Sequence, residues 1–333
     1  MQEFVVKMLC CPACHDQLVW DIREKFTHRI IHADVSCAGC QAVYQVRDGI
    51  GNFVVDPEDG VDLWQQADSA LLDHLEEHPE VKNKLLYGPV DALSPADQFF
   101  RSMALEELGE FEKSRTLEGK ANRGIYTEAY MACWDSQIEY VVTELAQGSG
   151  PVVDLASGHG YLAEQILLQC DRPMIITDFS PHVLRRNKQW LESVGEYHRV
   201  SLLAFDARHT PFKDDAVKCM VTNLGLPNIE NPGDLMKELG RVVDGSFLAI
   251  SHFFPEVEDA NAEILRQYQL EEAAYKRLSL EAFRAAGWQV TVENSCTGLA
   301  KPTAASELLD GIRIDGIPVV DTELEWCVLS ASH

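Results

Sequence analysis

The chain has 333 residues, 46% of them hydrophobic and 24% charged, so it is long enough for two globular domains and can bury a sizeable core. Its formal net charge is −25, which argues against a surface built to bind nucleic-acid phosphates. The longest basic cluster is Arg185, Arg186 and Lys188 on one predicted helix. The sequence shows no apolar run of membrane-spanning length and no signal-peptide pattern at its start, so we expect a soluble, cytoplasmic protein.

Four of the ten cysteines form two matched pairs, Cys11-Pro-Ala-Cys14 and Cys37-Ala-Gly-Cys40, which are separated by 22 residues. Four thiolates on two tight turns can close a tetrahedron around Zn²⁺, and such a site is structural because no coordination position stays open. Cys10 is a rival to Cys11 as a ligand. Buried free thiols or a redox pair are the alternatives, but neither explains two matched pairs. The spacing therefore predicts a structural zinc site.

The chain before the glycine-rich motif divides into two sections. Residues 1–56 contain short alternating segments that are typical of strands between turns, and the sequence DPEDG at 56–60 indicates a linker. Residues 61–148 have a helical pattern, and we expect them to form a cap or linker region whose helices are broken at Gly119 and Gly124.

Strand-like and helix-like segments alternate from residue 149 to residue 333. The predicted strands lie in PVVDLA, PMIITDF, RVSLLAF, VKCMVTNL and SFLAISHFF, and two late apolar segments, WQVTVEN and LEWCVLSAS, follow them. A helix-like segment follows each of the first four strands except the third, which leads into a turn. This alternation predicts an α/β domain with a parallel sheet and helices on both faces.

The strongest local signal is VVDLASGHGYLAEQIL, in which a buried strand ends at Asp154 and a helix begins near Gly160. The residues between them are small, and small side chains allow a ligand to approach the backbone at the N-terminus of the helix. The motif alone is weak, since other nucleotide-binding domains and ligand-free turns look similar. Asp178 and Asp206 follow the next two strands, so three acidic residues end successive strands. Helix capping does not explain that series well.

The ordered segments DLASGHG, TDFSP, FDARHTPFKDDA and VTNLGLPNIENPGDLMKELGRVV resemble the motif series of class I S-adenosylmethionine (SAM)-dependent methyltransferases, over about residues 150–331. The resemblance implies a Rossmann-like, seven-stranded sheet with an antiparallel edge strand, supplied by LEWCVLSAS, and SAM as the cofactor. It assigns the glycine turn to the methionine part, Asp178 to the ribose and Asp206 to the adenine amino group. Residues after the fourth strand would face the reacting methyl group.

The cofactor-binding residues that this resemblance implies are Asp154, Ala156, Ser157, Gly158, Gly160, Asp178, Phe179, Asp206, Ala207, Asn223 and Leu224. Ala156 stands where the family usually has the first glycine of the turn. A dehydrogenase fits less well, because the turn is not GxGxxG and the helix after the fourth strand follows the methyltransferase pattern.

The N-terminal segments LCCPACHDQLVW and SCAGCQAVYQVRDGIGNFV resemble the zinc ribbon of small activator subunits of tRNA and protein methyltransferases. They are also similar to the N-terminal zinc module of rRNA guanine methyltransferases. The resemblance implies a zinc-ribbon domain over roughly residues 5–55. It leaves the substrate open, and a protein partner could bind through the ribbon.

Three functions follow as hypotheses. The first is a methyltransferase acting on an O, N or C atom of a small molecule, with residues 61–148 and the insertion at 297–318 selecting the acceptor. The second is an RNA methyltransferase that recognises its substrate with the zinc ribbon, which the acidic charge disfavours. The third is a SAM-binding scaffold without turnover. His252, at the end of the fifth strand, is the first choice for a general base, ahead of His159 and His209.

Overall fold

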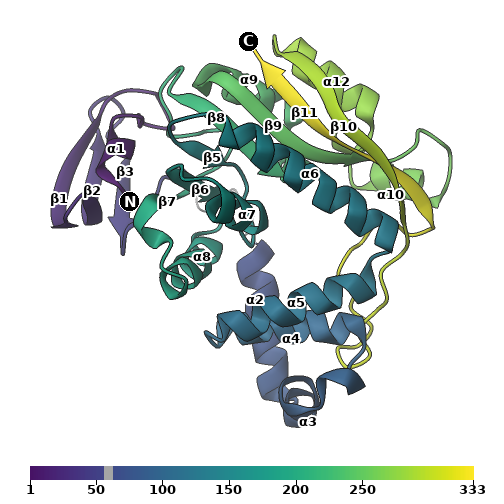
Figure 1. The fold of residues 1–333 in the computed structure, drawn as a ribbon. Coiled ribbons are helices and arrows are strands. Elements are labelled where there is room, and N and C mark those ends of the chain that lie inside the picture. Colours follow the sequence, from purple (N-terminus) through teal and green to yellow (C-terminus); the bar gives the residue numbers. More distant parts are fainter. Residues whose placement is uncertain (56–62) are drawn as a thin grey trace.

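The computed structural model describes residues 1–55 and 63–333, so the predicted linker at 56–60 lies outside the described residues. One mixed sheet of eleven strands runs through this part of the chain, in the order β1-β2-β3-β4-β7-β6-β5-β8-β9-β11-β10 (Figure 1). The strands are β1 Leu18–Phe26, β2 Arg29–Cys37, β3 Val43–Arg47, β4 Ile50–Asn52, β5 Val152–Asp154, β6 Met174–Asp178, β7 Val200–Ala204, β8 Val217–Asn223, β9 Val243–Phe253, β10 Gln289–Ala300 and β11 Thr322–Ser332.

Some of the helices cover the sheet, and others form a separate group. They are α1 Glu3–Val6, α2 Leu63–Glu77, α3 Pro79–Lys82, η1 Asn83–Tyr87, η2 Val90–Ala92, α4 Pro95–Glu107, α5 Phe111–Ile125, α6 Glu128–Ala146, α7 Tyr161–Gln169, α8 Pro181–Ser193, η3 Tyr197–Arg199, η4 Leu226–Asn228, α9 Pro232–Val242, α10 Ala260–Gln267, α11 Glu271–Ala274 and α12 Lys276–Ala285. None of the described helices is long and apolar enough to cross a membrane.

The centre of the sheet is parallel, from β4 through β7, β6, β5 and β8 to β9. The chain places β6 and β7 on one side of β5, and β8 and β9 on the other side. The direction of strand order therefore reverses beside β5, and a crevice for a ligand is expected outside the carboxyl ends of the strands at such a point.

The predicted count of seven strands is wrong for this sheet, because residues 1–55, which we call the four-cysteine module, add four more. The last of these strands, β4, pairs in parallel with β7, so that Ile50 lies opposite Leu202 and Asn52 opposite Ala204. At the other end, β11 is antiparallel to both neighbours, but β10 pairs outside it. The reversed strand is therefore second from the edge rather than at the edge.

The four-cysteine module shares a hydrophobic core with the rest of the chain. Phe53 and Leu9 from the module belong to the same buried cluster as Leu203, Phe205 and Phe212. Leu9 also pairs with Phe212 in an isolated antiparallel bridge. The packing thus continues across the sequence boundary at residue 56, while the division of the chain into three domains stays a prediction.

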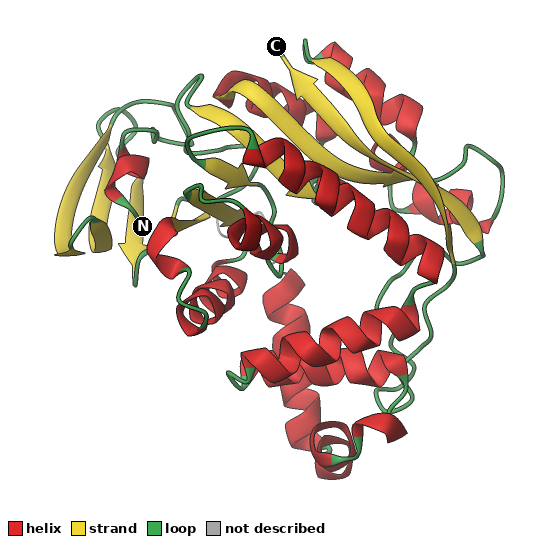
Figure 2. Cartoon of the chain, viewed as in Figure 1, coloured by secondary structure: helices red, strands yellow, loops and turns green. Residues whose placement is uncertain are grey.

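The helices α2 to α5 form a group set apart from the sheet, which we call the helical cap (Figure 2). The loop between β10 and β11 runs toward this group (Figure 1), and there Ser306 donates a hydrogen bond to Asp97 of α4 at 2.5 Å. Leu309 of the same loop packs with Leu75 and Leu85 of the cap. The late insertion and the cap therefore form one unit of packing.

One expectation for the helical section needs correction. The helix α6 packs mainly against β10 and β11. The helix α5 runs without interruption through Gly119 and Gly124. A Cβ atom on Gly124 would lie 2.9 Å from Pro95 Cγ, so this glycine permits close packing of α5 on the start of α4 and does not end the helix.

Candidate functional site

The glycine-rich turn follows β5 at the point where strand order reverses. Ala156, Gly158 and Gly160 all have left-handed backbones, with φ of 51°, 51° and 76°. The turn is held to β6 by a hydrogen bond of 2.8 Å from Ser157 N to Thr177 O. A Cβ atom added to Gly158 would meet no atom within 4 Å. The space beside the backbone is therefore open at this residue.

Asp154 ends β5 as a buried carboxylate, with 1% of the residue exposed. Neither of its carboxylate oxygens has a hydrogen-bond partner within residues 1–55 and 63–333. Burial, and then the nearby charge of Asp178, raise the pKa of Asp154 to about 8. A buried acceptor without a partner is unfavourable in the protein alone, so this carboxylate suits a ligand that carries hydrogen-bond donors or a positive charge.

Asp178, at the end of β6, holds the turn from the other side. Its carboxylate accepts hydrogen bonds of 2.9 Å from Gly158 N and from Ser180 N. It therefore ties the glycine turn to the start of α8. Phe179 follows it and lines a pocket at the same edge of the sheet. Each acceptor oxygen can receive a second hydrogen bond, so the predicted contact with ribose hydroxyls is compatible with this geometry.

Asp206 follows β7, and its carboxylate is already paired with Arg208. The guanidinium of Arg208 donates to both carboxylate oxygens at 2.6–3.0 Å, and Arg208 N donates at 2.8 Å. Burial disfavours the charged carboxylate, but these bonds hold the pKa of Asp206 below its usual range. Sequence analysis missed this pairing, although the spacing of Asp206 and Arg208 allows it. Ala207 lies buried between them.

A pocket of about 380 Å³ lies beside these residues. Its lining comes from the segment after β4, from the ends of β6 and β7, and from the start of α9. The lining residues are Val54, Val55, Phe179, Asp206, Arg208, His209, Asn231 and Asp234. His209, a weaker candidate for a base, thus lies at this pocket.

Asn223 and Leu224 follow β8 on the other side of β5. Trp134 of α6 donates a hydrogen bond of 3.2 Å from Nε1 to Asn223 Oδ1, and its ring stacks on Tyr161 at 5.1 Å between centroids. Leu224 has a left-handed backbone with φ of 55°. In the sequence, Trp134 falls in an apolar stripe with Ile138 and Val141 at helical spacing. That pattern held no signal that could reveal its contact with Asn223.

His252 lies near the end of β9 within an aromatic cluster. Its ring centroid is 4.9 Å from that of Trp326 and 6.3 Å from that of Tyr130. Burial lowers the pKa of His252 to about 4, so the imidazole is neutral at pH 7. The buried Nδ1 atom of His252 and the buried Nε1 atom of Trp326 have no hydrogen-bond partner in the part of the chain that the structure describes. These two nitrogen atoms therefore lie without a hydrogen-bond partner among the described residues, inside an apolar cluster.

The same cluster reaches the late insertion through two tyrosines. Tyr126 and Tyr130 stack at 4.7 Å between ring centroids, and Tyr126 donates a hydrogen bond of 2.8 Å to Asp315. Burial raises the pKa of Asp315. The aromatic cluster therefore joins β9 and β11 to α6, and Tyr126 links it to the insertion.

His159, inside the glycine turn, contacts the helical cap. Its Nδ1 atom lies 3.2 Å from Glu106 Oε2, and Arg115 donates a hydrogen bond of 2.8 Å to its carbonyl oxygen. Arg186 of α8 also lies within 4.0 Å of Glu106. These charges dock α4 and α5 on the turn, so His159 has a role in cap packing and is a weaker candidate for a base.

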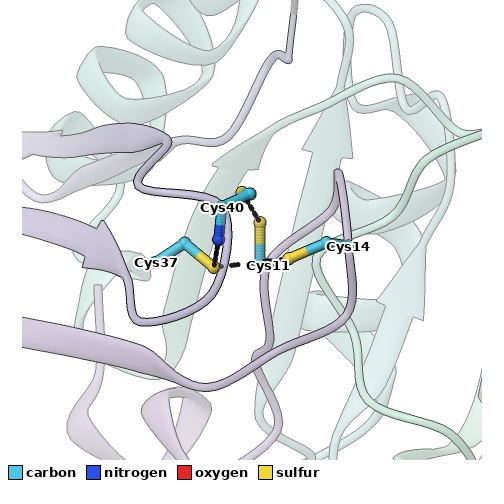
Figure 3. A group of neighbouring side chains, drawn as sticks. All are labelled: Cys11, Cys14, Cys37 and Cys40. Carbon is cyan, nitrogen blue, oxygen red and sulfur yellow. Dashed lines mark hydrogen bonds between the residues drawn. The ribbon is translucent and has the colours of Figure 1, made fainter.

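The four cysteines of the two pairs meet in space (Figure 3). Their sulfur atoms all lie within 4.8 Å of one another. Cys11 Sγ is 3.6 Å from Cys40 Sγ, and Cys14 Sγ is 3.4 Å from Cys37 Sγ. Cys10 points elsewhere and its thiol lies 3.2 Å from the carbonyl oxygen of Phe212, so Cys11 and not Cys10 completes the cluster.

Comparison with known families supports the assignment of the central sheet. Residues 153–250 match the family described as a methyltransferase domain. The match runs from β5 through the glycine turn to β9. The prediction of a methyltransferase domain is therefore confirmed, and the match covers the crevice described above.

Two curated relatives carry the same description, ubiquinone/menaquinone biosynthesis C-methyltransferase UbiE. The protein from Proteus mirabilis is 27% identical over 120 residues, which are 35% of this chain and 48% of the relative. The protein from Haemophilus ducreyi is 23% identical over 120 residues, which are 35% of this chain and 46% of the relative. The chain thus spans about half the length of the curated relatives it matches.

Two solved structures are similar to part of this chain. The YcgJ protein from Bacillus subtilis is 14% identical, with a TM-score of 0.46 over 59% of this chain and 97% of that chain. Geranyl diphosphate C-methyltransferase from Streptomyces coelicolor A3(2) is 12% identical, with a TM-score of 0.45 over 60% of this chain and 76% of that chain.

Proposed function

We propose that the protein is a SAM-dependent methyltransferase that methylates an O, N or C atom of a small molecule. One observation carries the proposal: the buried carboxylate of Asp154 lies without a hydrogen-bond partner among the described residues, next to an open left-handed turn. A ligand with a cationic or N–H-donating group would satisfy this carboxylate. The ammonium and sulfonium groups of SAM have that chemistry.

The residues present fit this cofactor. Asp154 and the turn from Ala156 to Gly160 would hold the methionine part, and Asp178 would hold the ribose. Phe179, Asp206 and Ala207 would surround the adenine, with Asn223 and Leu224 facing the reactive end. When bound, SAM supplies an activated methyl group, so the protein contributes mainly by positioning the acceptor and by taking up a proton.

His252 is the residue that we propose for contact with the acceptor. Its neutral imidazole, with a buried Nδ1 and no partner within the described chain, can accept a hydrogen bond or a proton. The buried ring of Trp326 beside it excludes water, and the partly exposed ring of Tyr130 can contact an apolar acceptor. The cap contacts the glycine turn through Glu106, and the late insertion contacts Tyr126 through Asp315. Both would therefore select the acceptor.

A small-molecule acceptor is favoured over RNA for two reasons. The net charge of −25 opposes binding to phosphates, and the curated relatives are named for quinone biosynthesis rather than for RNA modification. The RNA alternative rests on the zinc-ribbon resemblance of the four-cysteine module. A scaffold without turnover would bind SAM equally well but transfer no methyl group.

We also propose that the four cysteines hold a structural Zn²⁺ ion. A tetrahedron with Zn–S bonds of about 2.3 Å separates its sulfur atoms by about 3.8 Å, and two of the separations in the structure are 3.4 and 3.6 Å. Four thiolate ligands leave no open position, so the ion would stabilise the fold and not take part in catalysis. Reduced thiols of this kind support a cytoplasmic location.

The deciding experiment supplies SAM with a labelled methyl group to the purified protein and to separate small-molecule, RNA and protein fractions of a cell extract. We expect label in the small-molecule fraction. Label in RNA with steep salt dependence would support the RNA alternative. Binding of SAM without labelled product in any fraction would support the hypothesis of a scaffold without turnover, and the proposed activity would be wrong.

A pair of variants then tests the role of His252. The substitution His252→Gln should lower turnover by about a hundredfold or more, because a positioned base contributes that much, while binding of S-adenosylhomocysteine (SAH) stays as in the wild type. His198→Gln, at an exposed residue of η3, is the matched control. Unchanged turnover in the His252 variant would remove this residue from the mechanism.

A further inference from the structure

The pocket of about 380 Å³ is lined by two distant parts of the chain. Val54 and Val55 come from the four-cysteine module, directly after β4. Phe179 and Asp206 come from the methyltransferase domain, directly after β6 and β7. The pocket therefore lies where the module meets the carboxyl edge of the central sheet.

The pairing of β4 with β7 explains how the two valines reach this edge. Asn52 lies opposite Ala204 in the parallel pair, and Phe53 N donates a hydrogen bond of 2.8 Å to Ala204 O. Since parallel strands end at the same edge of a sheet, Val54 leaves β4 where the chain leaves β7 toward Asp206. A slip of one residue would turn the side chains of the module strand to the opposite face.

The wall that the valines form is apolar, while the facing residues are partly polar. Val55 has 43% of its surface exposed, and Phe179 contributes a ring to the same pocket. Asp206, Asn231 and Asp234 supply acceptors to the lining, beside Arg208 and His209. An aminopurine such as adenine matches this lining, because its faces are apolar and its edge carries an amino group that donates hydrogen bonds.

We propose that the four-cysteine module forms one wall of the pocket for the adenine end of SAM, through Val54 and Val55. This inference rests on the proposed function, since it assumes that SAM is the ligand. It gives the module a part in cofactor binding within its own chain. A module whose sole task is to recruit a protein partner would not need these two side chains at the pocket.

The test compares two ligands and two sets of variants by calorimetric titration, with no turnover needed. SAH carries both the adenine and the amino acid, and 5′-methylthioadenosine carries the adenine alone. We expect the double variant Val54→Ala/Val55→Ala to bind both ligands about tenfold more weakly, because each substitution removes apolar contact area. Val43→Ala, at a position of β3 that is 67% exposed, is the matched control and should bind both as the wild type does.

The outcomes separate the inference from the function on which it rests. If the wild type binds neither ligand, the proposed function fails. If the wild type binds SAH and the double variant binds both ligands within twofold of it, the inference is overturned. Weaker binding of SAH alone also overturns it, because the loss would then lie at the amino-acid end.

A second variant covers the case in which the double variant does not fold. Val55→Ser changes a half-exposed side chain and leaves Val54 packed against the core. It should weaken both ligands by about threefold, with a thermal unfolding midpoint within a few degrees of the wild type. Unchanged affinity for both ligands in this folded variant would again overturn the proposal.

Discussion

The buried carboxyl group of Asp154 is expected to favour ligand binding but to lower the stability of the ligand-free protein. Its carboxyl ordinarily has a pKa of about 3.9 in an unfolded chain, and burial with the nearby Asp178 raises it to about 8 in the folded protein. Between these two values the folded state binds more protons than the unfolded state. The free energy of unfolding contributed by this group therefore falls as pH rises from about 3.9 to about 8.

The substitution Asp154→Asn should accordingly stabilise the ligand-free protein while it weakens binding. We expect the unfolding midpoint of the variant to exceed that of the wild type at pH 8 and the difference to shrink toward pH 4, measured by differential scanning calorimetry. Affinity for SAH should fall by about tenfold or more, because the amide carries no charge for the ammonium group. A variant that is less stable at pH 8, or that binds SAH as before, contradicts this account.

Ala156 also carries a local cost to stability, in this case from backbone strain. Its backbone is left-handed, with φ of 51°, which costs an L-residue with a Cβ atom about 1 kcal/mol or more. Glycine removes that strain but loses more entropy on folding, by about 0.5–1 kcal/mol. Ala156→Gly should therefore leave stability unchanged or raise it by up to about 1 kcal/mol, as measured by urea unfolding, with SAH affinity retained. A loss of more than about 1 kcal/mol would show that the methyl group packs productively.

Among the contacts between elements, the junction between α4 and the glycine turn depends on the buried charge of Glu106. Glu106 is 3% exposed. Burial alone would raise its pKa, but the neighbouring imidazole of His159 and the guanidinium groups of Arg115 and Arg186 lower it to about 2. In an unfolded chain a glutamate has a pKa of about 4.3. The stability from this group is therefore present above about pH 4.3 and is lost as pH falls toward about 2.

Glu106→Gln should destabilise the folded protein at pH 7 by about 3 kcal/mol, because it leaves buried cations without their partner. Acid unfolding of the wild type should steepen below about pH 4.3, and the variant should lack that part of the transition. Both are measured by far-ultraviolet circular dichroism. Glu110→Gln, which removes an exposed pair with Lys113 in the same cap, should change stability by less than about 1 kcal/mol. Equal effects of the two substitutions would contradict the role of the junction.

The four-cysteine module and the methyltransferase domain are joined through the sheet. The strand β4 pairs with β7, and one buried cluster includes side chains from both parts. If the four cysteines bind Zn²⁺ as proposed, we expect its removal by a chelator, or the substitution Cys37→Ser, to lower the temperature of a single unfolding transition by about 10 °C or more. Added Zn²⁺ should restore the wild type after chelation but not the variant. Two separate transitions in calorimetry would show that the four-cysteine module folds on its own.

Local patterns in the sequence predicted much of the methyltransferase domain. Asp154 and Asp178 end successive strands and Asp206 follows the next strand, because the end of a strand is read from a few neighbouring positions. The same holds for Cys11 and Cys37, whose pairs lie on tight turns of fixed spacing. Contacts between distant segments left no such signal. Trp134 bonds to Asn223 across 89 positions of the chain, and an apolar stripe on a helix looks the same with or without that partner.

The sequence alone was sufficient to assign the seven strands after residue 149 with the helices α7, α8 and α9, the glycine turn and the two cysteine pairs, since each is encoded within about a dozen neighbouring residues. It did not indicate α10, α11 and α12, which lie between β9 and β10. It could not reveal that the four strands of the four-cysteine module extend the central sheet to eleven strands. Pairing of β4 with β7 brings Ile50 opposite Leu202, far along the chain, and an edge strand carries no mark of the edge on which it will dock. That docking brings Val54 and Val55 to the pocket beside Asp206. The folded chain thereby completes its pocket with residues from a segment whose sequence indicated a metal site.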